Sequence, residues 1–136
     1  MTVVVVDCNV LAYLLLDGAE TPRSRTLLEK DADWHSEALL MIEFTNVLVT
    51  AMRARGLAMK DASQAVTQAM GVMEPGLHTA SHQEVLTMAA HHRVSAYDAR
   101  YLVVARDLGV KLVTEDVKLR KAAPRLTQSL ADAVGY

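Results

Sequence analysis

Apolar positions along the chain occur both in short continuous runs and in longer segments with helical spacing. The run Val3–Val6 is β-branched and continuous, which is typical of a strand buried on both faces of a parallel sheet. We expect a second such strand at 110–113 and shorter strands at Trp34–His35 and 126–130. The intervening segments predict helices over residues 9–16, 22–30, 37–55, 59–74, 82–92, 96–108 and 117–123.

Residues with capping preferences mark the predicted helix ends. Thr21, Ser36, Ser81 and Ser95 precede helical segments, where a side-chain oxygen can accept a hydrogen bond from a backbone N–H of the first turn. Gly56 is expected to end the long helix before it. Strands that alternate with helices favour an α/β fold with right-handed crossovers. We therefore predict three layers, with a mainly parallel central sheet of four to five strands flanked by about seven helices.

Composition narrows the possible functions. The chain has 136 residues, enough for one domain over residues 1–136 with no second core. Its 14 Lys and Arg residues against 16 Asp and Glu residues give a net charge of −2, which excludes a nucleic-acid binder held by bulk positive charge but leaves a local phosphate contact open. Cys8 is the only cysteine, which excludes a disulfide framework and a cysteine-based zinc site and fits a reducing, cytoplasmic location.

We expect no membrane-spanning or targeting segment. No apolar run approaches the roughly 20 residues that span a bilayer, so no membrane partner is predicted. The start Met1–Asp7 has no basic region and reaches an acidic residue at once, which is not typical of a signal peptide.

Carboxylates follow both apolar strand runs. Asp7 comes directly after Val3–Val6, and Glu115 and Asp116 follow the strand at 110–113. In a parallel sheet these strand ends lie at the same edge, where α/β folds bind their ligands. Each acid alone is explained as well by an N-cap role, since Asp favours that position. Two such acids at the expected ligand edge favour a site, whereas Glu115 is expected to be a solvated neighbour.

Two further acids occupy helical segments. Glu43 is surrounded at helical spacing by Leu and Val side chains, and burying a carboxylate there is costly unless it is paired or coordinated. It either reaches solvent or an Arg at the edge of this stripe, or belongs to a site in which Asn46, one turn on, orients it. Asp98 lies in the first turn after Ser95, where it is explained equally by a capping box.

Convergence of these acids would imply a metal ion. Four carboxylates in one pocket do not all stay ionised without a cation, because like charges raise one another's pKa. Mg²⁺ or Mn²⁺ prefers carboxylate oxygens, and one or two such ions can generate hydroxide and stabilise an in-line phosphoryl displacement. Whether the acids converge depends on the fold.

Four short motifs, in their order and spacing, resemble those of PIN-domain nucleases, in particular the VapC-type toxins of toxin–antitoxin pairs. The motifs are Val5–Leu11, Glu43–Leu48, Ser95–Tyr101 and Leu112–Asp116, and the resemblance covers essentially the whole chain. It implies a PIN-like fold in which the catalytic and metal-binding acids are Asp7, Glu43, Asp98 and Asp116. It also implies that the Thr114 hydroxyl supports Asp116. Asn9 is expected to lie next to Asp7 and to support it without being one of the metal-binding acids.

The resemblance implies an activity as well. The expected reaction is metal-dependent hydrolysis of RNA phosphodiester bonds by an endoribonuclease, with Mg²⁺ or Mn²⁺ as cofactor and 5′-phosphate and 3′-hydroxyl ends as products. Toxins of this kind are expected to be homodimers silenced by a cognate antitoxin, whose tail places a basic side chain near the acids. Cys8 departs from the family's usual Thr or Ser after the first acid. Because a thiol is a weaker donor than a hydroxyl, this puts metal affinity or rate in question.

Basic residues close to Asp116 are candidate contacts for RNA phosphates. These are Lys118, Arg120, Lys121 and Arg125. They would supply the local positive charge that the whole chain lacks. A solvated basic helix face explains them equally well.

Other classes of protein compete with this interpretation. A receiver domain would show paired acids after the first strand, and a haloacid-dehalogenase-like phosphatase would show Asp-x-Asp, but Cys8 and Asn9 follow Asp7 here. Within the family, the alternatives are a catalytically silent PIN scaffold that only binds a partner and a housekeeping RNA-processing nuclease. Binding of a divalent ion discriminates against the first alternative, and an antitoxin partner discriminates against the second.

Overall fold

The computed structural model describes residues 3–135 and contains a five-stranded parallel sheet. The strand order is β3-β2-β1-β4-β5. The strands are β1 (Val4–Val6), β2 (Trp34–Glu37), β3 (Leu77–His78), β4 (Leu112–Val113) and β5 (Thr127–Gln128). This confirms the predicted α/β fold. Residues 1, 2 and 136, which the expected single domain includes, lie outside the described residues.

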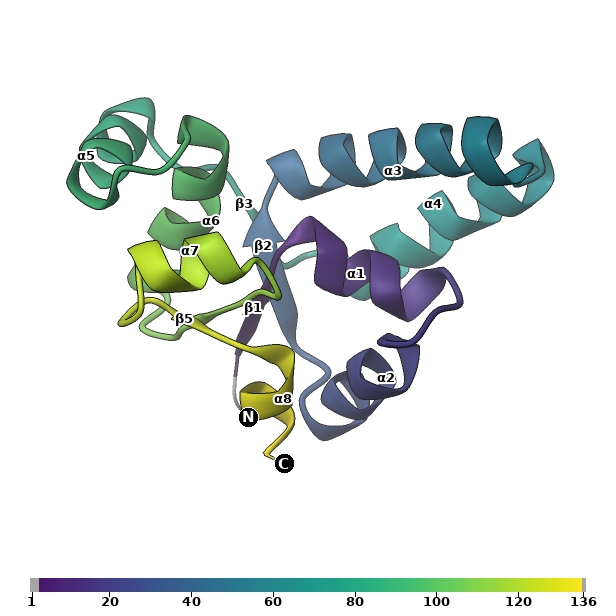
Figure 1. Cartoon of the computed structure of the whole chain (residues 1–136), viewed down its shortest axis with the longest axis horizontal. Coiled ribbons are helices and arrows are strands. Elements are labelled where there is room, and N and C mark those ends of the chain that lie inside the picture. The colour runs from purple at the N-terminus through teal and green to yellow at the C-terminus, as the bar shows by residue number, and fades with distance from the viewer. Residues whose placement is uncertain (1–2, 136) are drawn as a thin grey trace.

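Within residues 3–135, eight helices surround the sheet (Figure 1). They are α1 (Cys8–Leu15), α2 (Thr21–Lys30), α3 (Leu39–Arg55), α4 (Met59–Met73), α5 (His82–His92), α6 (Ala96–Asp107), α7 (Val117–Ala122) and α8 (Leu130–Val134). In Figure 1, α1 to α4 lie to the right of β1, and α5 to α7 lie to its left. Helix α6 packs against β1, β2 and β4, whereas α4 packs against β2. None of the described helices is both long and apolar enough to cross a membrane.

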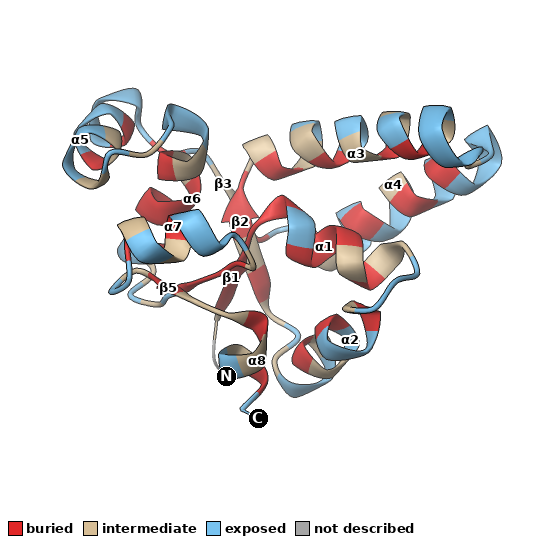
Figure 2. Cartoon of the chain, viewed as in Figure 1, coloured by how far each residue is buried: buried red, intermediate tan, exposed pale blue. Residues whose placement is uncertain are grey.

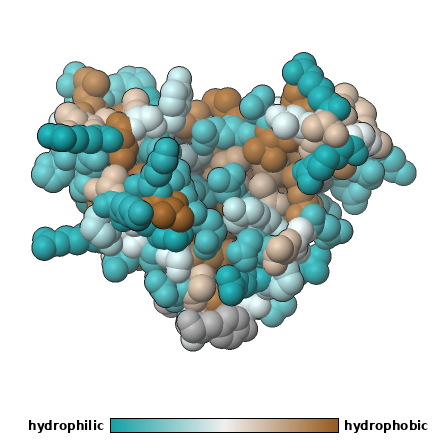
Figure 3. Space-filling view, viewed as in Figure 1, coloured by the Kyte–Doolittle hydropathy of each residue, from teal (hydrophilic) through white to brown (hydrophobic). Residues whose placement is uncertain are grey.

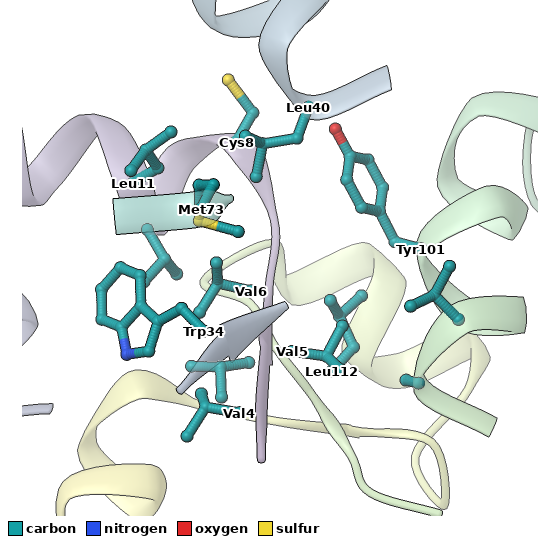
Figure 4. Packing of buried hydrophobic residues seen from close by; sticks show 14 of the residues in the cluster. Val4, Val5, Val6, Cys8, Leu11, Trp34, Leu40, Met73, Tyr101 and Leu112 are labelled. Atoms are coloured by element: carbon teal, nitrogen blue, oxygen red, sulfur yellow. The ribbon is translucent and has the colours of Figure 1, made fainter. Parts of the chain in front are cut away.

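The core is built around β1, which is buried on both faces (Figure 2). Val5 pairs with His35 of β2 and with Leu112 of β4, so β1 lies in the middle of the sheet. Because successive side chains of a strand point to opposite faces, Val5 lies beside Leu112, while Val4 and Val6 face the side of Trp34 (Figure 4). The continuous β-branched run therefore contributes to the core on both sides.

The long helix begins later than the sequence predicts. Ser36 was expected to cap it, but Ser36 lies within β2, where its Oγ donates a hydrogen bond to the Val6 carbonyl at 2.7 Å. Helix α3 starts at Leu39, and the carboxylate of Glu37 accepts a hydrogen bond from the Leu39 N–H at 2.7 Å. The N-cap prediction at Ser36 was therefore wrong, because a contact with a distant strand takes the hydroxyl that would have capped the helix.

Other elements also differ from the prediction, and the strand expected at 110–113 covers only Leu112–Val113. Thr21 is the first residue of α2 rather than its N-cap, and its hydroxyl donates to the Tyr13 carbonyl at 2.5 Å. The strand expected over 126–130 covers only Thr127–Gln128, after which Ser129 caps the unexpected helix α8. Strand β3 was not expected either, because two residues are too few to show a period.

Gly76 allows β3 to approach β2. A Cβ at this position would lie 2.2 Å from the Trp34 carbonyl oxygen and 3.1 Å from the Met73 carbonyl oxygen. The Gly76 carbonyl in turn accepts a hydrogen bond from the Ser36 N–H at 3.0 Å. Only glycine has room for this pairing, because both obstructing atoms belong to backbone.

We expect Gly76→Ala to lower the free energy of unfolding by at least about 2 kcal/mol, because backbone must move to admit the methyl group. Gly71→Ala is the matched control, since a Cβ at that exposed position of α4 meets nothing within 4 Å. It should gain about 0.5–1 kcal/mol from helix propensity. Urea unfolding of both variants measures the difference, and equal stability of the two would contradict the close β2–β3 contact.

Candidate active site

The four acids singled out in the sequence line one cleft of about 440 Å³. Asp7 follows β1, and Asp116 lies between β4 and α7, so both lie at the carboxyl edge of the sheet. Glu43 reaches the cleft from α3, and Asp98 reaches it from the first turn of α6. In the space-filling view, the upper outline dips between a lobe on the side of α5 and a lobe on the side of α3 and α4 (Figure 3).

Asp7 is the most buried of the four carboxylates, with 8% of its surface exposed. It is the N-cap of α1, where Oδ1 accepts a hydrogen bond from the Val10 N–H at 3.1 Å. Its other oxygen, Oδ2, accepts a hydrogen bond from the Thr114 hydroxyl at 2.5 Å. Burial raises the pKa of Asp7 to about 6, and the charges of Asp116 and Asp98 add to this increase. The two hydrogen bonds lower the pKa but do not offset the loss of water around the carboxylate.

Thr114 connects the two acids that follow strands. Its hydroxyl donates to Asp7 and accepts a hydrogen bond from the Asp116 N–H at 3.1 Å. Asp116 is also the N-cap of α7, because its Oδ1 accepts from the Leu119 N–H at 3.1 Å. Asp7 and Asp116 thus both cap helices and line the cleft. The N-cap role and the place in a site, which the sequence left as alternatives, therefore apply to the same residues.

Glu43 is held by a residue that the sequence analysis did not single out. The Tyr101 hydroxyl donates a short hydrogen bond to Glu43 Oε1. Tyr101 lies on α6, one turn after Asp98, and is buried. In the sequence, Tyr101 is the last residue of the Ser95–Tyr101 motif and lies three residues after Asp98, which places it near Asp98 on one face of a helix. Burial and the neighbouring Glu43 raise the pKa of Tyr101, so its hydroxyl keeps its proton and remains a donor.

Asp98 combines a capping position with a place in the cleft. Its backbone N–H donates to Ser95 Oγ at 3.0 Å, as the capping-box pattern predicts. Partial burial raises the pKa of Asp98 above its ordinary value, and the charges of Asp116 and Glu43 raise it further. The acids therefore influence one another's ionisation across the cleft.

The remaining predicted neighbours occupy the same cleft. Asn9 and Asn46 line it with exposed side chains, but in the described residues the hydrogen-bond partner of Glu43 is Tyr101 rather than Asn46. Cys8 also lines the cleft and is buried. Burial, with smaller effects of Glu43 and Asp7, raises the pKa of the Cys8 thiol to about 12, so the thiol stays neutral.

Glu115 and Arg120 are engaged away from the cleft. Glu115 Oε1 accepts a hydrogen bond from the Leu130 N–H at 2.7 Å, and the side chain is partly exposed, so it is less solvated than expected. Arg120 donates to the Thr114 carbonyl at 2.8 Å and approaches Glu115 Oε2 at 3.6 Å. Arg120 therefore supports the β4–α7 connection. Lys118, Lys121 and Arg125 have exposed positions nearby.

A partly buried ion pair helps to join the two helices that carry Glu43 and Asp98. Glu37, at the end of β2, accepts a hydrogen bond from Arg100 of α6 at 2.8 Å. The same carboxylate accepts from the N–H of Leu39, at the start of α3, and from that of Ala80 before α5. Because Glu37 is almost fully buried, its contacts with Arg100 and with the Leu39 N–H help to fix how α6 and α3 lie on the two sides of the cleft.

The donor set of the cleft fits a hard divalent cation. Its lining includes four carboxylates and, within residues 3–135, no Lys, Arg or His side chain. Carboxylate oxygens are the ligands that Mg²⁺ and Mn²⁺ prefer. In the described part of the chain, no three acidic, His or Cys side chains gather closely enough to surround one ion. The acids thus share a cleft without meeting at one point.

The ionisation of Asp7 predicts a pH-dependent cost in stability. The folded state binds the Asp7 proton more tightly than the unfolded chain does, because the pKa rises from 3.8 to about 6 on folding. The wild type should therefore lose stability as pH rises through this window. Asp7→Asn keeps a good N-cap without the charge. It should be more stable than wild type by about 3 kcal/mol at pH 7.5 and nearly equal to it at pH 4.

Urea unfolding in EDTA at the two pH values measures this difference. A gap between wild type and Asp7→Asn that is the same at both pH values would mean that burial of the charge is not its cause.

Comparisons with known proteins agree with the fold. The chain is 29% identical over 126 residues to Ribonuclease VapC3 of Pyrobaculum aerophilum, covering 90% of this chain and 95% of that protein. The crystal structure of PAE2754 from the same organism matches the fold with a TM-score of 0.77 at 20% identity, over 98% of this chain and 96% of that one. The PIN domain family model matches residues 4–124, which excludes the receiver and dehalogenase-like alternatives. The chain therefore belongs to the PIN domain family.

Proposed function

We propose that this protein is a metal-dependent endoribonuclease that acts as the toxin of a type II toxin–antitoxin pair. The observation that carries the proposal is the cleft itself, in which four carboxylates from four segments of the chain are accompanied by no basic side chain among the described residues. The similarity to Ribonuclease VapC3 along nearly the whole chain supports the same activity.

PIN nucleases generally use divalent metal ions, and we propose Mg²⁺ or Mn²⁺, as one or two ions, for this chain. Asp7, Glu43, Asp98 and Asp116 would hold the metal. When bound, a divalent ion stabilises the negative charge that develops on a phosphate during hydrolysis. The protein's own contribution is to fix the carboxylates: Thr114 holds Asp7, and Tyr101 holds Glu43.

Lys118 and Lys121 are the proposed contacts to RNA phosphates. Both are exposed on α7, the helix that Asp116 caps, and so lie beside the cleft. Arg120 is held by the Thr114 carbonyl and Glu115, so we assign the phosphate contact to the two lysines in preference to it. Because the cleft is acidic, attraction of the RNA backbone must come from side chains outside it.

We also propose a homodimer and a cognate antitoxin as partners. A basic side chain of the antitoxin, placed among the four carboxylates, would neutralise them in the way that a metal ion does and would compete with it. The alternatives are a silent scaffold and a housekeeping nuclease. The first predicts no binding of Mn²⁺, and the second predicts no inhibitory partner.

We expect Asp98→Asn to lower RNA cleavage by at least about 100-fold while the protein stays folded. Asp132→Asn is the matched control, because Asp132 has the same place after Ser129 in α8 that Asp98 has after Ser95 in α6. Both substitutions remove a negative charge from the first turn of a helix and leave the backbone hydrogen bond to the serine in place, and only Asp98 lines the cleft.

The assay uses refolded, partner-free protein and a panel of fluorescent RNAs in Mg²⁺, in Mn²⁺ and in EDTA. Metal-dependent cleavage that survives in Asp98→Asn would refute its role. Folded wild-type protein that neither cleaves RNA nor binds Mn²⁺ would favour the silent scaffold.

We expect the double substitution of Lys118 and Lys121 by Gln to raise KM for single-stranded RNA several-fold at moderate salt, with little change in kcat. The plot of log affinity against log salt should flatten by about 0.7 for each lysine that contacts a phosphate. Lys60→Gln, at an exposed position of α4, is the control for lost charge alone. An unchanged salt slope in the double variant would mean that neither lysine of α7 contacts an RNA phosphate.

A further inference from the structure

Large apolar side chains are exposed to solvent next to the acids of the cleft. Six large hydrophobic residues of the described chain are strongly exposed, and three of them are sequence neighbours of a cleft carboxylate. Ile42 precedes Glu43 and is 70% exposed, Tyr97 precedes Asp98 and is 65% exposed, and Val117 follows Asp116 and is 52% exposed. Exposed apolar side chains are common singly, but a concentration around one site indicates a ligand.

Tyr97 and Ile42 also form part of the cleft wall, from α6 and α3 respectively. Tyr97 lies in the first turn of α6, so its ring is carried by the same rigid turn that presents Asp98. The other aromatic ring of this wall, Tyr101, is buried and is engaged by Glu43. Tyr97 is therefore the aromatic face that the cleft offers to a ligand.

We propose that Tyr97 stacks on an unpaired nucleobase of the RNA next to the phosphate that is cut, with Ile42 contacting the same base. This rests on the proposed nuclease function and adds the residues of the cleft that contact a base of the substrate. A divalent ion held by the carboxylates would account for the phosphate group, but the carboxylates themselves repel the RNA backbone. Stacking on an aromatic ring supplies affinity without charge and without preference for one base.

The stack on Tyr97 requires an unpaired base. In an RNA duplex the bases are stacked on one another and their faces are not available to a side chain. A base can lie on Tyr97 only when it is splayed out of the strand.

The position of the apolar residues favours a base over a protein partner at this wall. The central part of a protein–protein interface is depleted of charged side chains. Here Ile42 and Tyr97 line the same cleft as the carboxylates, and each immediately precedes one of them in the chain. This arrangement suits a nucleotide, which carries an apolar base close to its phosphate. A partner protein that uses Tyr97 instead would give a different outcome in the experiment below.

The test compares Tyr97→Leu with wild type on a single-stranded RNA that wild type cleaves. The leucine keeps an apolar side chain but has no ring face. We expect kcat/KM to fall by about 10-fold, mainly through KM, and Tyr97→Phe to restore most of the loss because it keeps the ring. Leu86→Ala, at an exposed position of α5 outside the cleft, is the control for removal of surface apolar area.

Abasic RNAs locate the contact. Removing the base at one position beside the cut should lower kcat/KM of the wild type by about as much as Tyr97→Leu does on intact RNA. The two changes together should give no further loss, because both remove the same stack. The same sequence annealed to its complement should be cleaved more slowly.

Three results would overturn the proposal. Tyr97→Leu could cleave intact RNA as wild type does, or its loss could be the same on every abasic RNA, or it could escape inhibition by the antitoxin with cleavage unchanged. All three leave the nuclease function standing, because wild type still cleaves. If wild type cleaves no RNA, the nuclease function fails first. Fluorescence anisotropy of the same RNAs with both proteins then tests the stack, and equal affinities would refute it.

Discussion

The structure depends on the parallel pairing of β1 with β4. This pairing joins segments more than a hundred residues apart and sets Val6 opposite Val113, so that the next residues of the two strands meet at the same edge. The Asp7 N–H reaches the Val113 carbonyl at 3.4 Å, and the Thr114 hydroxyl reaches the Asp7 carboxylate. Because both strands end in an acid that caps the following helix, the pairing alone places two carboxylates in one cleft.

The other two carboxylates depend on how α3 and α6 are placed over that edge. Glu37 connects the beginning of α3 to Arg100 of α6, and the Tyr101–Glu43 hydrogen bond connects the same helices inside the cleft. The cleft thus gathers negative charge that the fold itself does not neutralise. The raised pKa of Asp7 comes mainly from burial of its carboxylate, and the neighbouring acids Asp116 and Asp98 add to it. Such perturbed carboxylates are typical of functional sites.

The sequence by itself determined the alternation of strands and helices, because burial on both faces of a strand and one-sided burial of a helix leave different periods. It also placed Asp7 and Asp116 at strand ends and Asp98 in a capping turn, since these positions depend on neighbours close in the chain. The order of the motifs indicated the family, which the family model over residues 4–124 confirms.

Only the tertiary structure decided which groups meet. Tyr101 as the partner of Glu43, Leu130 as the partner of Glu115 and the placement of Ser36 in a strand all depend on residues 15 to 58 positions away. Local preference made Ser36 a cap, but a strand neighbour offered its hydroxyl a buried acceptor instead. Whether four acids between positions 7 and 116 share one cleft depends on strand order and helix packing. The spacing of apolar residues along the chain does not contain this information, because it reflects only the local burial of each element.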